Sequence, residues 1–387
     1  MAVSLLSHEV SDLCIGKPPV RSLPITASVG EALAALKRCP DNELCIVGTD
    51  RLSSSEKKVI AGKVGLADVI CYLCSSDDNL VDPLGALNKP LSDLLLLKEI
   101  GGSGRAIVCQ IEPRASLFKA IDEILDGAGT LVVPIHSRAS WRKHHSTTAE
   151  FCWLTHEDLI RYLLGSISLF SHVATLSISS LILIRPITLS ISQHEPAISA
   201  IPLLQQAISN GTSVAVLSDN GCLLGEISPP QLSSCDESVA AAIAALSAGE
   251  FLSYLEYQYH GFLPESFSNF IKTRLKEDGL TGLMNLMEEV SSGSLLSSGS
   301  SSDEESVQHK GHLGRTMSRG YGRRSPVEVV ACSPESSLVA VIVQAIAHRV
   351  GYVWVVDGGE EFGGQDEEKL VGIVTFSDIL KVFREQL

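Results

Sequence analysis

A hydroxyl and a carboxylate stand three residues apart at two places where a strand pattern runs into a helix pattern. Thr375 and Asp378 close one strand, and Thr155 and Asp158 close another. A strand end that feeds a helix N-terminus is a natural site for anions and polar ligands. The carboxylate can accept from both hydroxyls of a ribose, and the threonine can donate to a phosphate or ribose oxygen. The same spacing also suits a helix cap, and spacing alone favours the cap.

Two weaker copies of this pair occur elsewhere in the chain. Asp68 keeps the carboxylate, but Gly65 takes the hydroxyl position. Ser228 keeps a hydroxyl, but Gln231 replaces the acid. A glutamine can donate or accept one hydrogen bond and carries no charge, so contact with a ribose weakens there. At best, two of the four turns are intact.

The turns belong to a repeated order of strand, helix, strand, strand and helix, which is clearest in residues 327–387. A strand at 327–332 precedes a buried helix, for which Ser333 suits the N-cap and Pro334 the first helical position. The alternating apolar segment YVWVVD predicts the second strand. A third strand and an amphipathic helix then complete the unit.

Three further units have the same order. In the first unit, Ser28 and Glu31 predict a capping box at a helix start. In the third, Pro202 interrupts the apolar helix pattern, so we expect a distorted helix start. The predicted units are 1–76, 90–165, 166–236 (degenerate) and 327–387, with a helical insertion at 237–290 and a disordered, serine-rich and basic loop at 291–326.

Composition limits the class of protein. Hydrophobic residues make up 45% and charged residues 19% of the 387 residues, which is a globular balance, and the net charge is -15. An acidic surface is unsuited to nucleic acid, so no nucleic-acid partner is expected. The first twenty residues include Glu9 and Asp12 and predict no export signal. We therefore expect a cytoplasmic or nuclear protein whose ten cysteines stay reduced.

Residues 163–184 contain no Asp, Glu, Lys or Arg and are long enough to span a membrane. Their serines and the β-branched second half favour a buried helix end, a linker and a strand instead. No membrane contact is therefore expected.

Few other residues indicate chemistry. Cys71 and Cys74 form a lone C-x-x-C on a predicted helix, without the second pair that a structural zinc site needs, so a core position is favoured and no metal is expected. No nucleophile–base pair stands out, which predicts a protein that is not an enzyme.

In the predicted loop, Ser300 and Ser318 have acidic and basic neighbours that suit kinase recognition. An unmodified flexible insertion is the equal alternative.

The segment GIVTFSD resembles the G-h-h-T-x-x-D signature of CBS (cystathionine-β-synthase-type) domains. The resemblance implies an α/β fold of four β-α-β-β-α CBS repeats paired into two modules, at roughly 1–165 and 166–387. Four such repeats resemble the gamma regulatory subunits of AMP-activated and sucrose-non-fermenting protein kinases. The interrupted fourth unit resembles related plant CBS-domain-containing proteins.

In that family, two repeats pair through their sheets, and the clefts between them hold AMP, ADP, ATP or other adenosyl compounds. The resemblance therefore implies adenosyl-ligand contacts, without a required cofactor, at Thr375, Asp378, Thr155, Asp158, Asp68 and Ser228. It also implies energy sensing and a protein partner, either kinase catalytic and beta subunits or a second copy of the chain.

The family often has a basic pair before the central strand that holds the phosphate. At these positions the chain has Glu43, Gly129, Thr212 and Gly351 at the first residue of each pair, so tight triphosphate binding is not expected. Two hypotheses follow. The preferred one is a non-catalytic regulatory module that senses an adenosyl ligand and acts on a partner. The alternative is a ligand-free CBS scaffold for protein–protein interaction.

Overall fold

The computed structural model describes residues 7–39, 42–50, 57–101, 108–135, 150–292, 328–357 and 369–386. Most of the predicted loop at 291–326, including Ser300 and Ser318, lies outside these residues. Val327, the first residue of the strand predicted at 327–332, lies outside them as well.

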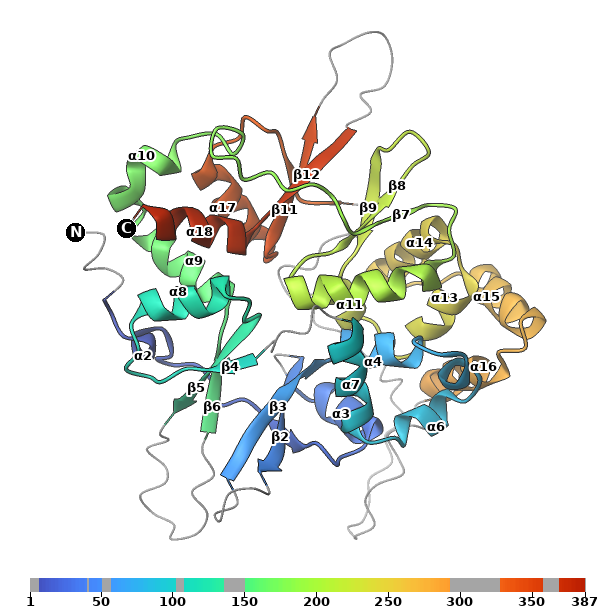
Figure 1. Cartoon of the computed structure of the whole chain (residues 1–387). Helices are drawn as coiled ribbons and strands as arrows, with labels where there is room; N and C mark the ends of the chain where they lie inside the picture. The colour runs from blue at the N-terminus through green and yellow to red at the C-terminus, as the bar shows by residue number, and fades with distance from the viewer. Residues whose placement is uncertain are drawn as a thin grey trace, which may run out of the picture.

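Four three-stranded sheets form the framework of the described residues (Figure 1). In each sheet the first strand pairs in parallel with the second, which pairs antiparallel with the third. The predicted α/β fold with four β-α-β-β-α repeats is thereby confirmed. The strands are β1 (Ser22–Pro24), β2 (Glu43–Asp50) and β3 (Lys57–Gly65); β4 (Val108–Gln110), β5 (Thr130–Ile135) and β6 (Glu150–Leu154); β7 (Ser190–Ser192), β8 (Val214–Leu217) and β9 (Leu223–Ile227); and β10 (Ala331–Cys332), β11 (Tyr352–Asp357) and β12 (Lys369–Thr375).

Each unit has one helix after its first strand and another after its third. These are α3 (Val29–Leu36) and α4 (Leu66–Leu73), α8 (Leu117–Leu125) and α9 (His156–Gly165), α11 (Ile201–Asn210) and α12 (Pro229–Ser233), and α17 (Leu338–His348) and α18 (Phe376–Glu385). The other helices are α2 (Val10–Leu13), α5 (Asp77–Val81), α6 (Pro83–Leu87), α7 (Leu91–Gly101), η2 (Ile167–Phe170), α10 (Ser171–Ala174), η3 (Ala197–Ala200), α13 (Val239–Ala245), α14 (Ala248–His260), α15 (Glu265–Glu277) and α16 (Thr281–Ser292).

Local sequence signals account for several helix starts. The capping box predicted at α3 is present, since the backbone N–H of Glu31 donates to Ser28 and that of Ser28 donates to the Glu31 carboxylate. The cap predicted for α17 is wrong: Ser337 accepts from the backbone of Ala340 and begins the helix. Ser333 instead accepts a backbone bond from Ser336 and closes a turn before the helix.

Pro202 has the effect that its position predicts. The helix of the third unit starts as the 3₁₀ segment η3 and continues as α11, with Pro202 in the first turn of α11. Proline has no backbone N–H to donate to the preceding turn, so a regular α-helix cannot run through this point.

The strand predicted in the second half of residues 163–184 is wrong. After η2 and α10 the chain makes turns, with one antiparallel bridge between Ser177 and Ser337. Ile178 and Leu183 are buried in the core of the second and fourth units, so core packing takes up the β-branched pattern without a strand. Within the described residues, no helix is long and apolar enough to cross a membrane.

Sheets join units within a module, and helices join the two modules. Cys45, Val132 and Trp153 form a small apolar cluster between the sheets of the first and second units. Helix α4 of the first unit packs on α11 and α12 of the third, and α9 of the second packs on α17 and α18 of the fourth. The four units therefore surround a common centre (Figure 1).

A buried carboxylate joins the third and fourth units despite the long insertion between them. Glu226 on β9 is fully buried and accepts from the Tyr352 hydroxyl at 3.0 Å and from the Trp354 indole N–H at 2.7 Å, both on β11. A buried carboxylate needs such donors, because an unpaired one loses its hydration without compensation. The fourth unit is thus held against its neighbour by charge-assisted hydrogen bonds.

We expect Glu226→Ala to lower the free energy of unfolding by at least about 1–3 kcal/mol, because it leaves two buried donors without their shared acceptor. Tyr352→Phe removes one of these donors along with its bond and should cost about 1 kcal/mol. Urea denaturation measures both. Equal stability of Glu226→Ala and the unaltered chain would contradict a role for this carboxylate in joining the units.

Candidate functional site

The turn of the fourth unit is closed by internal hydrogen bonds. One oxygen of the Asp378 carboxylate accepts from the Thr375 hydroxyl at 2.6 Å and from the Thr375 backbone N–H at 3.0 Å. The other oxygen forms an ion pair with the guanidinium of Arg185. Asp378 is only 5% exposed, so both carboxylate oxygens are engaged inside the protein.

The turn of the second unit repeats this arrangement. Asp158 accepts from the backbone and hydroxyl of Thr155 at 2.7 and 2.8 Å. The ammonium of Lys17 lies 2.5 Å from the same carboxylate and also donates to the carbonyl of Trp153 at 2.8 Å. The cap and the ion pair thus share one carboxylate oxygen of Asp158, Oδ2.

The two incomplete turns differ from each other. In the first unit, Asp68 accepts from the backbone N–H of Gly65 at 2.7 Å and pairs with the ammonium of Lys98 at 2.8 Å. In the third, Ser228 and Gln231 make a capping box, but the Gln231 amide nitrogen has no hydrogen-bond partner in the described part of the chain. Thus a lysine or arginine pairs with the turn in the first, second and fourth units, whose turns have an acid.

Each cation comes from the segment that precedes the first strand of the other unit in its module. Lys17 precedes β1 and reaches the second unit, and Arg185 precedes β7 and reaches the fourth. Lys98, on α7 before β4, reaches back to the first unit. The helix-cap interpretation is therefore what the hydrogen bonds show, and ribose contact at these acids stays a prediction.

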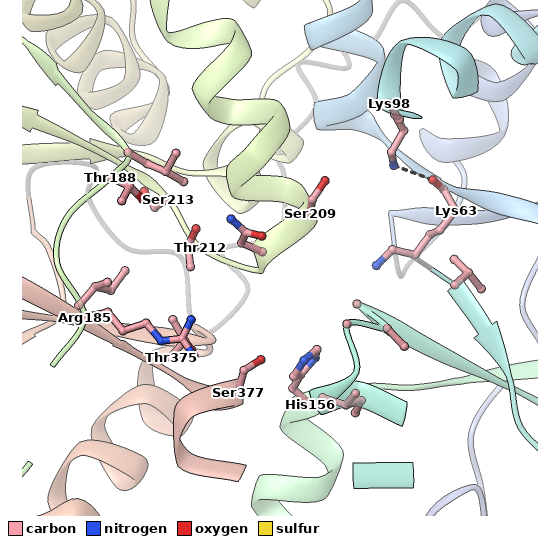
Figure 2. A pocket seen from close by; sticks show the side chains of 18 of the residues that line it. Lys63, Lys98, His156, Arg185, Thr188, Ser209, Thr212, Ser213, Thr375 and Ser377 are labelled. Atoms are coloured by element: carbon pink, nitrogen blue, oxygen red, sulfur yellow. Dashed lines mark hydrogen bonds between the residues drawn. The ribbon is translucent and has the colours of Figure 1, made fainter. Parts of the chain in front are cut away.

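A cavity of about 740 Å³ lies where the four units meet. Of the six predicted site residues, Thr375 lines it, and the other five are not on its wall. Asp68 lies at a separate small cavity of about 10 Å³. Figure 2 shows the labelled polar wall of the large cavity, formed by Lys63, Lys98, His156, Arg185, Thr188, Ser209, Thr212, Ser213, Thr375 and Ser377.

Two helices begin at this cavity. His156 is the first residue of α9, and Ser377 is the second residue of α18. The free N–H groups and the dipole of a helix N-terminus favour an anion. Thr212, a residue that is 7% exposed, lines the same cavity, and its buried hydroxyl has no hydrogen-bond partner among the described residues. The wall therefore has donor groups ready for a polar ligand.

The cations on the wall already have carboxylate partners. Lys63 lies 2.7 Å from Glu43, and Lys98 and Arg185 pair with two of the turn acids. Burial and the nearby charge of Lys63 lower the pKa of His156 to about 4, so the imidazole is neutral at pH 7. The cavity is thus suited to an anion of low charge rather than to a polyphosphate.

These cations lie away from the position beside the central strand where the family resemblance places a basic pair. Gly129 and Thr212 line the cavity at that position, whereas the positive charge comes from β3, α7 and the segment before β7. One signal could have found part of the set: Lys17 and Arg185 each stand five residues before the first strand of a module, at Ser22 and Ser190, and proline follows each of them.

The predicted Cys71 and Cys74 pair lies buried on α4. Within the described residues, no group of three or more His, Cys, Asp or Glu side chains could hold a metal ion.

Comparison with known proteins identifies the family. The CBS domain model matches residues 323–385. The chain is 41% identical to CBS domain-containing protein CBSX5 of Arabidopsis thaliana, over 100% of this chain and 99% of that one. It is 25% identical to CBSX6 of the same plant, over 100% and 95% of the two chains. The chain belongs to the family of CBS domain-containing proteins.

A solved structure from Methanocaldococcus jannaschii has the same fold. It covers 97% of this chain and 100% of its own, with a TM-score of 0.56 and 16% identity. That protein is described as a proposed archaeal homologue of the gamma subunit of AMP-activated protein kinase. At this identity the likeness concerns the fold.

Proposed function

We propose that the chain is a non-catalytic regulatory protein that binds an adenosyl ligand with a single phosphate in its central cavity. The change in structure that follows binding is transmitted to a protein partner. The observation that carries the proposal is the cavity of about 740 Å³ between the four units, whose wall combines two helix N-termini with Arg185 and Lys63. Cavities of about 300–1,000 Å³ are typical of small-molecule sites.

In this proposal, different parts of the ligand lie against different sides of the wall. The phosphate fits beside Ser377 and His156, which line the cavity in the first turns of α18 and α9. The hydroxyl of Thr212 is buried and unpaired among the described residues, and it would gain a partner from a ribose or phosphate oxygen laid against it. Apolar side chains such as Ile187 and Leu189 supply the surface on which a base can lie. AMP is favoured over ATP because each wall cation already shares its charge with a carboxylate.

The ligand can act on a partner because the cavity has walls from all four units. A ligand that prefers one arrangement of the two modules shifts the population toward that arrangement. A gamma-like role with kinase catalytic and beta subunits is the partner that we propose. It is supported by the fold that the chain shares with the archaeal protein described as a gamma-subunit homologue.

One observation favours the second candidate, a ligand-free scaffold for protein–protein interaction. Asp68, Asp158 and Asp378 are each already paired with a cation of the chain itself. A ribose that used Asp68 or Asp378 would have to displace Lys98 or Arg185, because both oxygens of each carboxylate are engaged. In the scaffold, these pairs are permanent and simply hold the linkers in place.

Thermal unfolding with AMP, ADP, ATP, adenosine and S-adenosylmethionine separates the two candidates. A ligand at a hundred times its Kd stabilises the folded chain by about 2.7 kcal/mol, so we expect AMP to raise Tm. Ser377→Glu places a negative charge at the helix N-terminus in the cavity, which suits the helix but repels phosphate. Ser377→Glu and Lys63→Gln should each weaken AMP binding by about tenfold or more, since a hydrogen bond to a charged group contributes about 1.5–3 kcal/mol.

Lys381→Gln is the matched control, because it makes the same change in net charge at an exposed position on α18. It should leave AMP binding unchanged. A shift that Ser377→Glu does not reduce would place the phosphate elsewhere. If none of the compounds raises Tm at millimolar concentration, the scaffold replaces the sensor.

A further inference from the structure

A short strap of chain crosses each unit at the start of its first helix. One residue of the strap makes an isolated antiparallel bridge with the N-cap of that helix, and the bridges join Ser28 with Pro90, Ser116 with Glu9, Pro196 with Ser247, and Ser337 with Ser177. Counted from the bridging residue, the four straps are residues 90–98, 9–17, 247–255 and 177–185. The straps are equivalent parts of one repeated arrangement, so a position can be compared across them by its distance from the bridge.

The last residue of each strap, eight positions after the bridge, stands at the turn of the unit. In three units it is the cation of an ion pair, and the pairs are Lys98 with Asp68, Lys17 with Asp158, and Arg185 with Asp378. In the third unit the same position is Leu255, which is 3% exposed, and the turn has Gln231 in place of an acid. Among these four units, the cation is present where the turn has a carboxylate and an apolar side chain replaces it where the turn has an amide.

The chemistry of an amide explains this match. The side-chain oxygen of Gln231 accepts from the backbone N–H of Ser228 at 2.9 Å, as the carboxylates do at the other turns. Its nitrogen is a donor and cannot accept from a lysine or an arginine. At Asp68 and Asp378, one oxygen caps the helix and the other binds the cation. The cap needs one oxygen, so the second oxygen of the acid serves the cation.

Two of the three cations reach the central cavity. Lys98 and Arg185 line its wall, and Figure 2 shows them on opposite sides of it. The backbone of Arg185 makes two hydrogen bonds with Ile373 on β12, at 2.9 and 3.0 Å. These bonds do not involve Asp378, so they keep Arg185 at the wall whether or not its ion pair is made.

We propose that Asp378 and Asp68 determine the charge of the ligand that the cavity accepts, because they neutralise Arg185 and Lys98 on its wall, and that they do not contact the ribose. This inference rests on the proposed function and names the residues that make its site selective for an anion of low charge. Each carboxylate cancels one positive charge, and the attraction between the wall and a phosphate group scales with the net charge that remains. A polyphosphate is therefore excluded by the turn acids rather than by the size of the cavity.

Exposure makes Asp378 the acid to change. The Arg185 side chain is 57% exposed, so a guanidinium released from its carboxylate stays hydrated. The Lys98 side chain is only 12% exposed, and loss of Asp68 would leave a nearly buried ammonium without its partner. Asp378→Asn keeps an oxygen for the cap with Thr375 and turns a nitrogen donor toward Arg185, so the helix start is retained and the ion pair is lost.

Isothermal titration calorimetry of the full chain with adenosine, AMP, ATP and inorganic tripolyphosphate tests the proposal. Asp378→Asn should bind ATP and tripolyphosphate at least about tenfold more tightly than the unaltered chain does, since the freed guanidinium gains a charge-assisted hydrogen bond. AMP should gain less, and adenosine, which has no charge, should bind equally to both. The gain for ATP should shrink at high salt. Arg185→Gln added to Asp378→Asn restores the net charge of the wall and should return ATP binding to its original strength.

Two further variants complete the design. Asp378→Gln copies the third unit, whose capping box with Gln231 shows that the fold accepts this amide at the turn, and it should behave as Asp378→Asn does even if the asparagine variant does not fold. Asp122→Asn is the matched control. It removes the same charge from an ion pair with Arg384, and neither of these two residues lines the cavity, so all four affinities should stay unchanged.

The four probes separate this proposal from the proposed function. If the unaltered chain binds no adenosyl compound, the adenosyl sensor fails, but the role of Asp378 stands if its amide variants bind tripolyphosphate more tightly. Equal weakening of adenosine, AMP and ATP in these variants would show that the acid contacts the ribose and would overturn the proposal. Unchanged binding of ATP and tripolyphosphate would reduce the acid to a helix cap, and an equal gain in Asp122→Asn would reduce the effect to the net charge of the whole chain.

Discussion

Replacement of Lys37 by alanine is expected to lower the free energy of unfolding by about 3–5 kcal/mol, which is the range for a buried ion pair that loses one member. Glu237, just before α13, is 0% exposed, and its carboxylate lies 2.6 Å from the ammonium of Lys37 at the end of α3. Its second oxygen has no hydrogen-bond partner among the described residues. The alanine variant would leave a buried charge without its cation. Urea denaturation at pH 7 measures the loss.

The double variant Lys37→Met and Glu237→Leu is the control. Replacing both members of a buried pair by apolar residues of similar volume is often neutral or stabilising, so most of the loss should be recovered. Arg384→Ala breaks the pair with Asp122 that also joins the modules, but both side chains are about a third exposed or more. We expect a smaller loss there, of about 1 kcal/mol. A small effect of Lys37→Ala would contradict the importance of the buried pair.

The turns could be predicted from the sequence because their geometry is local. A hydroxyl and an acid three residues apart form a capping box wherever a strand runs into a helix, and Thr155 with Asp158 and Thr375 with Asp378 do so. The order of strands and helices was also predictable, since it follows from apolar periodicity and turn residues within short windows.

The cations at the turns could not be predicted in the same way, because their partners are distant in sequence. Lys17 and Asp158 are separated by 141 positions, and their contact exists only once the segment before β1 has packed on the second unit. The ion pairs at Asp68, Asp158 and Asp378 change the interpretation of the site. The family signature alone points to four separate turns, whereas the structure shows one larger cavity between them.

Burial of apolar side chains explains why the strand that was predicted from β propensity does not form. Residues 177–184 have the β-branched pattern of a strand, but their bridge is a single one, between Ser177 and Ser337, and contact with the fourth unit's sheet begins just after them, between Arg185 and Ile373. Ile182, which has a φ of 55° and is 90% exposed, marks the turn that the segment makes instead. Tertiary packing of Ile178 and Leu183 outweighed the intrinsic preference for an extended chain.

The second large effect is a loss of stability in mild acid that depends on His156. Burial and Lys63 lower the pKa of this histidine from 6.5 to about 4 in the folded chain. Below pH 6.5 the unfolded chain takes up a proton that the folded chain takes up only near pH 4, so the free energy of unfolding falls across this window. At 1.36 kcal/mol for each pKa unit, the full loss is about 3 kcal/mol. Above pH 6.5 the effect is absent.

Urea denaturation at several pH values between neutral and about pH 4 measures this loss, with His156→Gln as the comparison. Glutamine does not titrate, so the stability of that variant should depend less on pH, and the difference between the two curves isolates His156 from the carboxylates that also titrate in acid. Parallel curves for the two proteins would show that His156 takes up its proton equally well in the folded chain, and that the cavity around Lys63 is wetter than the structure indicates.

The same histidine links pH to the proposed ligand. A phosphate beside the first turn of α9 would favour the charged imidazole and raise the pKa of His156 from about 4. Binding would then take up a proton at His156. The phosphate of AMP itself titrates at about pH 6, so the contribution of His156 is the difference between the pH dependence of AMP binding by the unaltered chain and by His156→Gln, and the unaltered chain should gain affinity relative to the variant as the pH falls from 7 toward 5. Adenosine, which has no phosphate, should bind without this gain. A pH dependence of AMP binding that is the same in the two proteins would place the phosphate away from α9, at Ser377 and Arg185 alone.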